Sequence, residues 1–339
     1  MKISFVVPVY NCKAFLPDCV SSIRQAGLSD HEILLIDDGS TDGSGALCDE
    51  LASGCPEIRV IHQANAGVSA ARNRGIREAS GQLLLFMDAD DSIDPQLLSD
   101  VLTDPRCMEV HMVIYGLTFD YYKNGRCYRQ DPIFYPANGI LDSQAWGADF
   151  LSLFEHNSLS PVWNKVYRTE ILQKYDLQFN EEMFLYEDLE FVLRYLQHCD
   201  TIWNVPKAIY HYRQAEDEGN AKRRLMRIHS IADFLVPIEA SLTTLAETNP
   251  AIDQALWQAV LQQLYLVLAR EKIAISDPAA IRCICLDYQN WIQTRKHPKM
   301  LNKFQDALLN THALRLYFRS KLSFVRHRIA VQVKYLLHK

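Results

Sequence analysis

The stretch QLLLFMDADDSIDP, residues 82–95, joins a short apolar run to a cluster of acids. Leu83 to Met87 are all apolar, and three carboxylates follow within four positions, at Asp88, Asp90 and Asp91. Like charges this close repel one another, so a cluster at the end of a buried strand requires a nearby cation. The sequence therefore raises the question of which cation balances these acids.

The 90 residues that end with this stretch alternate between strand and helix patterns. Segments rich in Val, Ile and Leu predict strands over 3–9, 32–37, 58–62 and 83–87. Helical spacing between them predicts helices over 13–25, from the turn at 38–40 to about 52, and over 68–79. Strands alternating with helices favour parallel pairing, right-handed crossovers and helices on both faces. The expected fold class is α/β, with a Rossmann-like, mostly parallel central sheet and flanking helices.

Polar residues follow each of these four predicted strands. In open parallel sheets the ligand crevice lies at the carboxyl ends of the strands. We therefore expect the following residues to form one site: Tyr10, Asn11, Asp37, Asp38, Asn65, Gly67, Asp88 and Asp90.

Two carboxylates separated by one residue suit a hard divalent cation with oxygen ligands. Mn²⁺ or Mg²⁺ fits Asp88 and Asp90, because no neighbouring Cys or His favours zinc. Mg²⁺ usually binds one or two carboxylates together with substrate phosphates, so a phosphorylated ligand is expected. The alternative is that these acids cap a helix that starts near Pro95, although Asp94 suits that role better. For Asp91, helix capping and a place in the metal site are equally favoured.

The rest of the chain predicts further elements and a second, helical region. A hairpin is expected over 109–135, with Asn124-Gly125 as its turn, and a strand over 201–212. Helices are expected around 143–155 and 184–198, and from about 221 to the end, with breaks near 249–250, 277–278 and 297–298. The predicted organisation is an α/β domain over 1–218, with halves of about 1–105 and 106–218, and an α-helical C-terminal region over 219–339.

Composition excludes several classes of protein. A formal net charge of −6 over 339 residues gives no reason to expect nucleic acid as a partner. Nine cysteines without a regular framework indicate reduced thiols and a cytoplasmic protein. No run approaches the roughly 20 apolar residues that a membrane span requires.

The C-terminal end is basic and amphipathic. From Lys303 to Lys339 there are eight Lys or Arg and one acid, Asp306, so the remainder carries 27 basic and 40 acidic residues, a formal −13. A helix over 314–339 carries an apolar stripe formed by Phe318, Leu322, Val325, Ile329, Val333 and Leu336. Such a helix suits the inner, anionic face of a cell membrane; the equally weighted alternative is packing on the α/β domain or on a second copy.

Five motifs together resemble family-2 glycosyltransferases of the GT-A fold. They are VVPVYN (6–11), LLIDDGSTDGS (34–44), NAGVSAARNRGI (65–76), LLLFMDADD (83–91) and MFLYEDLEF (183–191). Each block alone is weak evidence, whereas all five in this order and at these spacings are strong. The resemblance covers roughly residues 1–215 and leaves the tail unassigned.

The resemblance implies a site for a nucleotide-diphosphate sugar, usually a UDP-sugar. Asp38, beside Asp37, would hydrogen-bond the base, Asp88 would reach ribose or metal, and Asp90 would ligate the metal. The implied donor-binding residues are Pro8, Val9, Tyr10, Asn11, Asp37, Asp38, Asn65, Gly67, Arg72, Asp88, Ala89 and Asp90. The alternatives are an ordinary turn for the Asp37-Asp38 pair and a surface-helix arginine for Arg72.

The resemblance also implies inverting transfer, in which Asp188 is the base that deprotonates the acceptor hydroxyl. The alternative for Asp188 and Glu187 is stabilisation of a helix N-terminus, which is favoured for Glu187. His211 is a candidate metal ligand. Residues with candidate roles toward the acceptor or the diphosphate are Trp163, Lys165, Glu187 and Arg213; Trp163 is favoured as a core residue, and the loop after Arg213 departs from the family pattern.

The resulting hypothesis is a metal-dependent inverting hexosyl- or N-acetylhexosaminyltransferase of a bacterial surface-polysaccharide type. The acceptor would be a hydroxyl of a glycan or lipid-linked saccharide, and homo-oligomerisation is left open. One alternative is a non-catalytic nucleotide-sugar-binding protein of the same fold. The other alternative, an Asp-nucleophile phosphatase, is disfavoured. In that class D-x-D follows the first strand, and Thr or Val lies two residues further on, whereas here the motif follows the fourth predicted strand and Ser92 lies two residues beyond Asp90.

Overall fold

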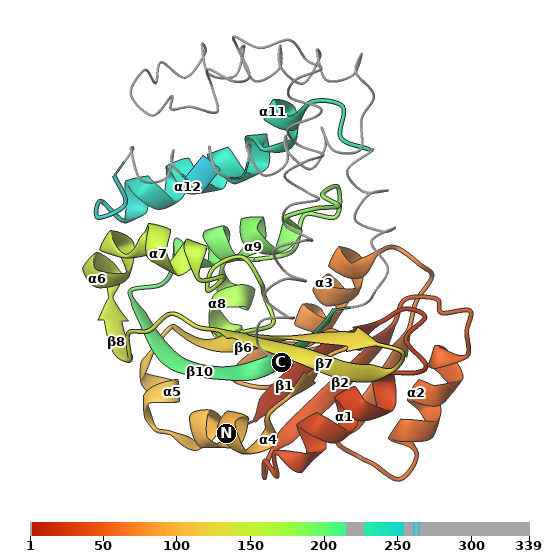
Figure 1. Ribbon diagram of the computed structural model, residues 1–339. Helices are drawn as coiled ribbons and strands as arrows, with labels where there is room; N and C mark the ends of the chain where they lie inside the picture. The colour runs from red at the N-terminus through yellow and green to blue at the C-terminus, as the bar shows by residue number, and fades with distance from the viewer. Residues whose placement is uncertain (1, 215–226, 254–259, 262–263, 265–339) are drawn as a thin grey trace. The chain divides into compact units, whose positions relative to one another are not determined.

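The computed structural model describes residues 2–214, 227–253, 260, 261 and 264. The described residues form one mixed sheet of ten strands in the order β3-β2-β1-β4-β9-β6-β10-β5, with β7 paired to β6 and β8 to β10 (Figure 1). Four parallel strands lie at one end of this order: β1 (Ile3–Val9), β2 (His31–Asp37), β3 (Ile58–His62) and β4 (Leu83–Phe86). The others are β5 (Ser92–Ile93), β6 (Met112–Lys123), β7 (Arg126–Ile133), β8 (Gly139–Asp142), β9 (Lys165–Arg168) and β10 (Thr201–Gln214).

Helices cover both faces of the sheet. Figure 1 shows α1 (Leu16–Gln25), α2 (Ser44–Ala52), α4 (Pro95–Thr103) and α5 (Arg106–Glu109) on one face. On the other lie α3 (Val68–Glu78), α8 (Thr169–Lys174) and α9 (Glu187–Leu196). The remaining described helices are α6 (Ser143–Ala148), α7 (Phe150–Glu155), α11 (Ile231–Phe234) and α12 (Val236–Thr248).

The predicted α/β class, with a central sheet and flanking helices, is confirmed. The four strands predicted from the first 90 residues form with ends within one residue of those expected. Three of them, β1, β2 and β4, are buried on both faces and therefore give nearly continuous apolar runs, whereas β3 is largely exposed or half-buried. Gly75 lets α3 lie close to β1: a Cβ at this position would be 2.1 Å from Val6 Cγ1. The hairpin turn at Asn124-Gly125 also forms as predicted, with Lys123 opposite Arg126.

The chain divides into two compact units, residues 1–216 with 240–257 and residues 217–239 with 258–339. The predicted domain boundary near 218 and the separate role of the C-terminal region stay predictions. The basic amphipathic helix expected over 314–339, and the helix breaks near 277 and 297, lie outside the described residues. None of the described helices has both the length and the apolar character needed to cross a bilayer.

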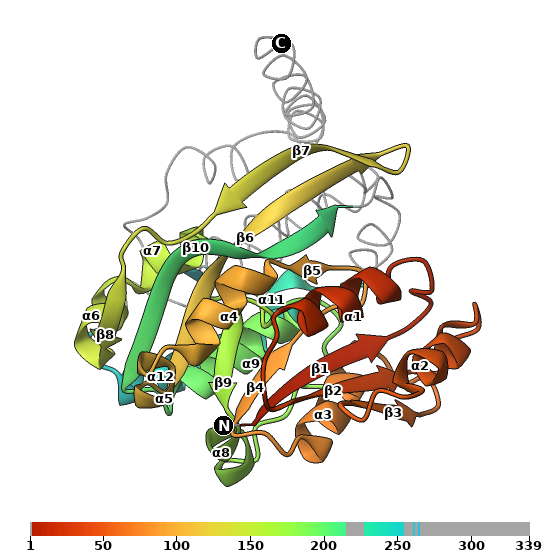
Figure 2. The same ribbon diagram turned by 90° about the horizontal axis from the view of Figure 1, so that it is seen from below.

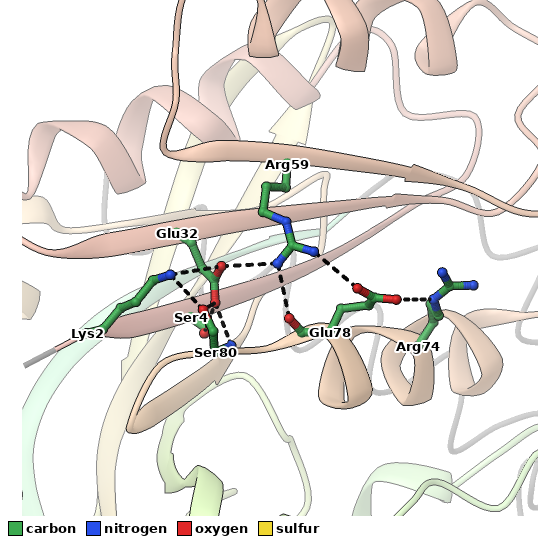
Figure 3. Close-up of polar contacts among 7 residues, drawn as sticks. All are labelled: Lys2, Ser4, Glu32, Arg59, Arg74, Glu78 and Ser80. Atoms are coloured by element: carbon green, nitrogen blue, oxygen red, sulfur yellow. Dashed lines mark hydrogen bonds and ion pairs between the residues drawn. The ribbon is translucent and has the colours of Figure 1, made fainter.

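A buried glutamate ties β1 and β2 to the segment before β4, at the amino ends of these strands (Figure 3). Glu32 of β2 accepts hydrogen bonds from Ser4 Oγ at 2.6 Å and from Ser80 N and Oγ, each at 2.7 Å. Lys2 and Arg59 supply positive charge, at 3.4 and 3.3 Å from its carboxylate. Burial alone would raise the pKa of Glu32, but the serine hydrogen bonds and Lys2 outweigh it and lower the pKa to about 2.

Replacing this glutamate should cost considerable stability. Because the pKa of Glu32 falls from 4.5 to about 2 on folding, the ionised carboxylate contributes about 3 kcal/mol above pH 5. That contribution should disappear as the pH falls from about 5 to 2. We expect Glu32→Gln to lower the free energy of unfolding by about this amount at pH 7 and to flatten its acid dependence, as measured by urea unfolding. The control is Glu57→Gln, which alters a surface pair with Arg24 and should change stability by less than about 1 kcal/mol.

Candidate active site

The loops after β1 and β2 are fastened to each other at the carboxyl end of the sheet. Asn11 has a positive φ of 52°, a conformation that asparagine tolerates better than most residues. Its Oδ1 accepts a hydrogen bond from Thr41 N at 2.8 Å, and its own N–H donates to Ser40 Oγ at 3.2 Å. Tyr10 beside it is half exposed, whereas Val9 is buried and Pro8 is partly buried. Hydrogen bonds therefore join the loop of the VVPVYN motif to that of the LLIDDGSTDGS motif, and the Tyr10 ring beside them is exposed.

The Asp37-Asp38 pair holds the neighbouring loops. Asp38 is 3% exposed, and its carboxylate accepts hydrogen bonds from Gln63 Nε2 and from the backbone N–H groups of Ala66 and Gly67, at 2.8 to 2.9 Å. Asp37 accepts from Ser40 N and His62 Nδ1, and these hydrogen bonds lower its pKa although burial opposes them. Asn65 donates to the backbone oxygen of Asp38 at 3.0 Å. Both acids thus hold the loops at the carboxyl ends of β1, β2 and β3, and their contact with a base stays a prediction.

Arg72 supplies a cation to the acidic cluster. This α3 residue is 3% exposed, and its guanidinium donates to Asp88 Oδ1 at 2.9 Å and to Asp188 Oδ1 at 2.6 Å. It therefore links the end of β4 to the start of α9, two segments that are 100 residues apart in the chain. Its Nε is buried and has no hydrogen-bond partner among the described residues. The surface-helix alternative for Arg72 is thereby excluded.

The other two acids of the D-A-D-D motif differ sharply in their surroundings. Asp91 is buried and accepts hydrogen bonds from Tyr210 Oη and from Arg213 N, both at 2.7 Å, so it anchors the loop to β10. Asp90 is partly buried; its carboxylate accepts a hydrogen bond from its own backbone N–H, and no other described residue donates one to it. Burial, followed by the charge of Asp88, raises the pKa of Asp90 to about 6. Asp94 caps α4, accepting from Leu97 N at 2.9 Å, as its position before Pro95 predicted.

The donor set around Asp90 fits a magnesium or manganese ion that binds together with phosphate. No group of three or more His, Cys, Asp or Glu in the described part of the chain is arranged to hold a metal ion by itself. A partly buried carboxylate that no other residue holds by a hydrogen bond can serve as the oxygen ligand of such an ion when phosphates complete its coordination. His211, the other candidate ligand, has its Nδ1 3.0 Å from Asp120 Oδ2. That contact leaves Nε2 as the nitrogen available for a ligand.

Asp188 lies in the first turn of α9. The preceding Tyr186 has a φ of 60°, a strained conformation for a non-glycine residue, and such strain commonly occurs at functional sites. The Asp188 side chain is 23% exposed. Burial raises its pKa to about 7, against the opposing charge of Arg72. A carboxylate that gains a proton near neutral pH is well matched to general-base chemistry.

The remaining candidates are more enclosed. Glu187 is 8% exposed. Lys165 is fully buried, which lowers its pKa, and its Nζ donates to Asn164 Oδ1 at 2.7 Å and to Pro161 O. Trp163 is 6% exposed and stacks on Tyr210, with 4.1 Å between ring centroids, as expected of a core residue. A direct role of any of the three toward the acceptor stays a prediction.

Arg213 lies beside the D-A-D-D loop. Its Nε donates to the backbone oxygen of Asp90 at 3.1 Å, and its guanidinium lies 3.9 Å from the Tyr122 ring centroid and 4.8 Å from that of Phe15. These contacts place a cation next to Asp90 and Asp91, where the diphosphate was expected.

Three residues of the site were absent from the sequence-based set. Tyr210 contacts both Asp91 and the backbone N–H of Asp88, Asp120 orients His211, and Gln63 contacts Asp38. Tyr210 directly precedes the candidate ligand His211 in the sequence, so its position gave a signal. Asp120 and Gln63 required knowledge of which strands pair.

Comparison with known proteins identifies the class. The family model "Glycosyl transferase family 2" matches residues 4–175, just over half of the chain. The chain therefore belongs to glycosyl transferase family 2. It is 31% identical over 213 residues to the uncharacterized glycosyltransferase EpsJ of Bacillus subtilis, an alignment covering 62% of this chain and 61% of EpsJ. The chain thus spans about three fifths of the length of that relative.

Solved structures of the same fold include S. aureus TarS and a mannosyltransferase, PcManGT, from Pyrobaculum calidifontis. TarS 1–349 in complex with UDP-GlcNAc superposes with a TM-score of 0.57 at 19% identity, covering 86% of this chain and 89% of TarS. PcManGT in complex with GDP-Man and Mn²⁺ gives a TM-score of 0.51 at 14% identity, and the match covers 94% of this chain and 86% of the PcManGT chain. These likenesses confirm the predicted GT-A fold.

Proposed function

We propose that this chain is an inverting, metal-dependent glycosyltransferase that takes its sugar from a nucleotide-diphosphate sugar, with UDP as the favoured carrier. The acceptor would be a hydroxyl of a glycan or lipid-linked saccharide in surface-polysaccharide synthesis. The observation that carries the proposal is the Arg72 bridge, which holds a donor-side acid, Asp88, and a separate carboxylate, Asp188, in one site. Family membership and the nucleotide-sugars bound by TarS and PcManGT support it.

In the proposed reaction Asp188 accepts the proton of the acceptor hydroxyl. The acceptor oxygen then forms a bond to the anomeric carbon while the bond from that carbon to the diphosphate breaks, which inverts the configuration and releases the nucleoside diphosphate. Arg72 keeps Asp188 oriented, and Arg213 places positive charge beside the loop that would face the diphosphate. The transition state is oxocarbenium-like.

A divalent ion, when bound, would neutralise charge that develops on the departing diphosphate. Asp90 is the residue best suited to hold it, because its carboxylate is partly buried and accepts no hydrogen bond from any other described residue. Asp88 is already paired with Arg72 and would contribute less directly. His211 would contribute through Nε2.

The test of the proposal is donor hydrolysis by the full chain across a panel of UDP-, GDP- and TDP-sugars. With Mn²⁺ or Mg²⁺ present, we expect slow release of nucleoside diphosphate from one donor, and EDTA should reduce that release at least about 100-fold. The non-catalytic alternative predicts that a nucleotide-sugar binds by calorimetry but no diphosphate is released. Release that is unaffected by EDTA would contradict the metal dependence.

A further inference from the structure

One face of the β6–β7 hairpin carries aromatic and polar side chains that the donor site does not use. We call it the hairpin face and define it by Phe119, Tyr121, Tyr128, Arg129, Asp131 and Tyr212. Strand register places these side chains together: Phe119 lies opposite both Asp131 and Tyr212, and Tyr121 lies opposite Arg129. Tyr128 occupies the irregularity in pairing after Tyr121, with its ring 6.3 Å from the Tyr121 ring. Figure 2 shows β7, β6 and β10 running side by side.

The hairpin face is continuous with the catalytic site through stacked rings. Trp163 stacks on Tyr210, whose hydroxyl contacts Asp91 and the Asp88 N–H, and also on Tyr212 at 5.4 Å. Tyr212 lies 5.6 Å from Phe119, edge to face. From the level of Tyr210 to Tyr121 the strands advance by roughly 13 Å, which exceeds the length of one hexose ring.

The outer part of the face is accessible and offers polar groups at the edge of its rings. Tyr128 is half exposed, and about a third of each side chain of Arg129 and Asp131 is exposed. Arg129 Nε donates to Asp131 Oδ1 at 2.8 Å, and its guanidinium lies 4.9 Å from the Tyr121 ring centroid. Because the charges of Arg129 and Asp131 balance, this face favours an uncharged hydroxylated ligand over a polyanion.

We propose that the hairpin face binds the acceptor, and that the acceptor is an uncharged saccharide chain longer than one residue. The inference rests on the proposed function. The C–H side of a sugar ring, which carries partial positive charge, stacks on the negative face of an aromatic ring. Arg129 and Asp131 donate and accept hydrogen bonds with sugar hydroxyls. The terminal residue then lies toward Tyr212 and the carboxylates, and earlier residues lie on Tyr121 and Tyr128.

The test measures binding of neutral oligosaccharides to the full chain by saturation-transfer NMR. The probes are tri- to pentasaccharides of glucose, galactose and N-acetylglucosamine, with an oligomer of glycerol phosphate as the anionic comparison. We expect at least one neutral oligosaccharide to bind, and Tyr121→Ala and Tyr128→Ala each to weaken it about tenfold. Tyr175→Ala removes an exposed aromatic ring at the end of α8, outside the face, and should leave the Kd unchanged.

Three results would overturn the inference: no neutral oligosaccharide binds; the Kd is the same in both hairpin variants; or only the glycerol phosphate oligomer binds in a Tyr128-dependent manner. Donor hydrolysis, measured on the same samples, separates this inference from the proposed function. Wild type and both variants should hydrolyse the donor equally, because the hairpin face lies outside the donor site. Donor hydrolysis without saccharide binding contradicts the acceptor assignment alone, whereas absence of donor hydrolysis contradicts the function.

Discussion

Asp188→Asn should reduce the rate of sugar transfer by a factor of about 10² to 10⁴ at saturating donor. This is the range that a positioned general base contributes, and the amide cannot accept the acceptor's proton. Asparagine has nearly the same shape, so its Oδ1 can still accept the hydrogen bond from Arg72 that now measures 2.6 Å. The dissociation constant for the donor should therefore change little. Quench-flow or coupled assays of kcat, with calorimetric measurement of donor binding, separate the two effects.

The matched control for this variant is Glu182→Gln, which neutralises an exposed acid a few residues before α9. It should leave kcat within about twofold of wild type, because a surface charge at that position has no partner in the proposed chemistry. A transfer rate for Asp188→Asn within tenfold of wild type would assign the base to another residue. Glu187, the adjacent acid, would then be the next candidate.

Arg72→Met should destabilise the fold and impair catalysis together. The guanidinium is 3% exposed and pairs with two carboxylates, so the substitution leaves Asp88 and Asp188 in a partly buried site without their cation. Removing one partner of a buried ion pair typically costs about 3–5 kcal/mol. The pKa of Asp188 should also rise further above 7, because the Arg72 charge now opposes its increase. Urea unfolding and the pH dependence of kcat measure the two consequences.

Arg74→Met is the control for this prediction, since it removes an arginine from the same helix. Arg74 is 40% exposed and pairs with Glu78 one turn away, an arrangement worth about 0.3–0.5 kcal/mol. If Arg72 had a purely structural role, its replacement would lower the free energy of unfolding without changing the pH at which activity appears. If the free energy of unfolding of Arg72→Met is less than about 1 kcal/mol below that of wild type and the pH dependence of kcat is unchanged, the Arg72 bridge contributes neither to stability nor to the pKa of Asp188.

The sequence predicted the first half of the sheet well because its physical signal is local. Strands such as Ile3–Val9 and Leu83–Phe86 are apolar runs bounded by polar residues, and helices of clear periodicity lie between the first four strands. The antiparallel insertion of β9 between β4 and β6 was not predictable in this way. Its four residues, KVYR, carry no periodicity, and its pairing partners lie at Leu83–Leu84 and at Met112–Ile114, far away in the chain. The short strands β5 and β8 were missed for the same reason.

The site was predictable in its composition but not in its pairings. Four strand ends with polar residues indicated a common location, and the structure brings Asp88, Arg72 and Asp188 into contact there. The sequence alone did not show which acids are balanced by the protein itself and which one is left for a metal ion. Arg72 balances Asp88, whereas Asp91 is held by Tyr210 and a backbone N–H. Of these three acids, only Asp90 accepts no hydrogen bond from another described residue, so the metal hypothesis now rests mainly on this residue.

The most direct test of the account is calorimetric titration of UDP and GDP into wild type and Asp90→Ala, with Mn²⁺ and with EDTA. We predict that one nucleotide binds wild type in Mn²⁺, and that binding weakens at least about tenfold with EDTA and equally in the variant. In the variant, Mn²⁺ should no longer improve binding. Equal affinity of wild type and Asp90→Ala in Mn²⁺, or binding that EDTA does not change, would contradict a metal–nucleotide site at the D-A-D-D motif.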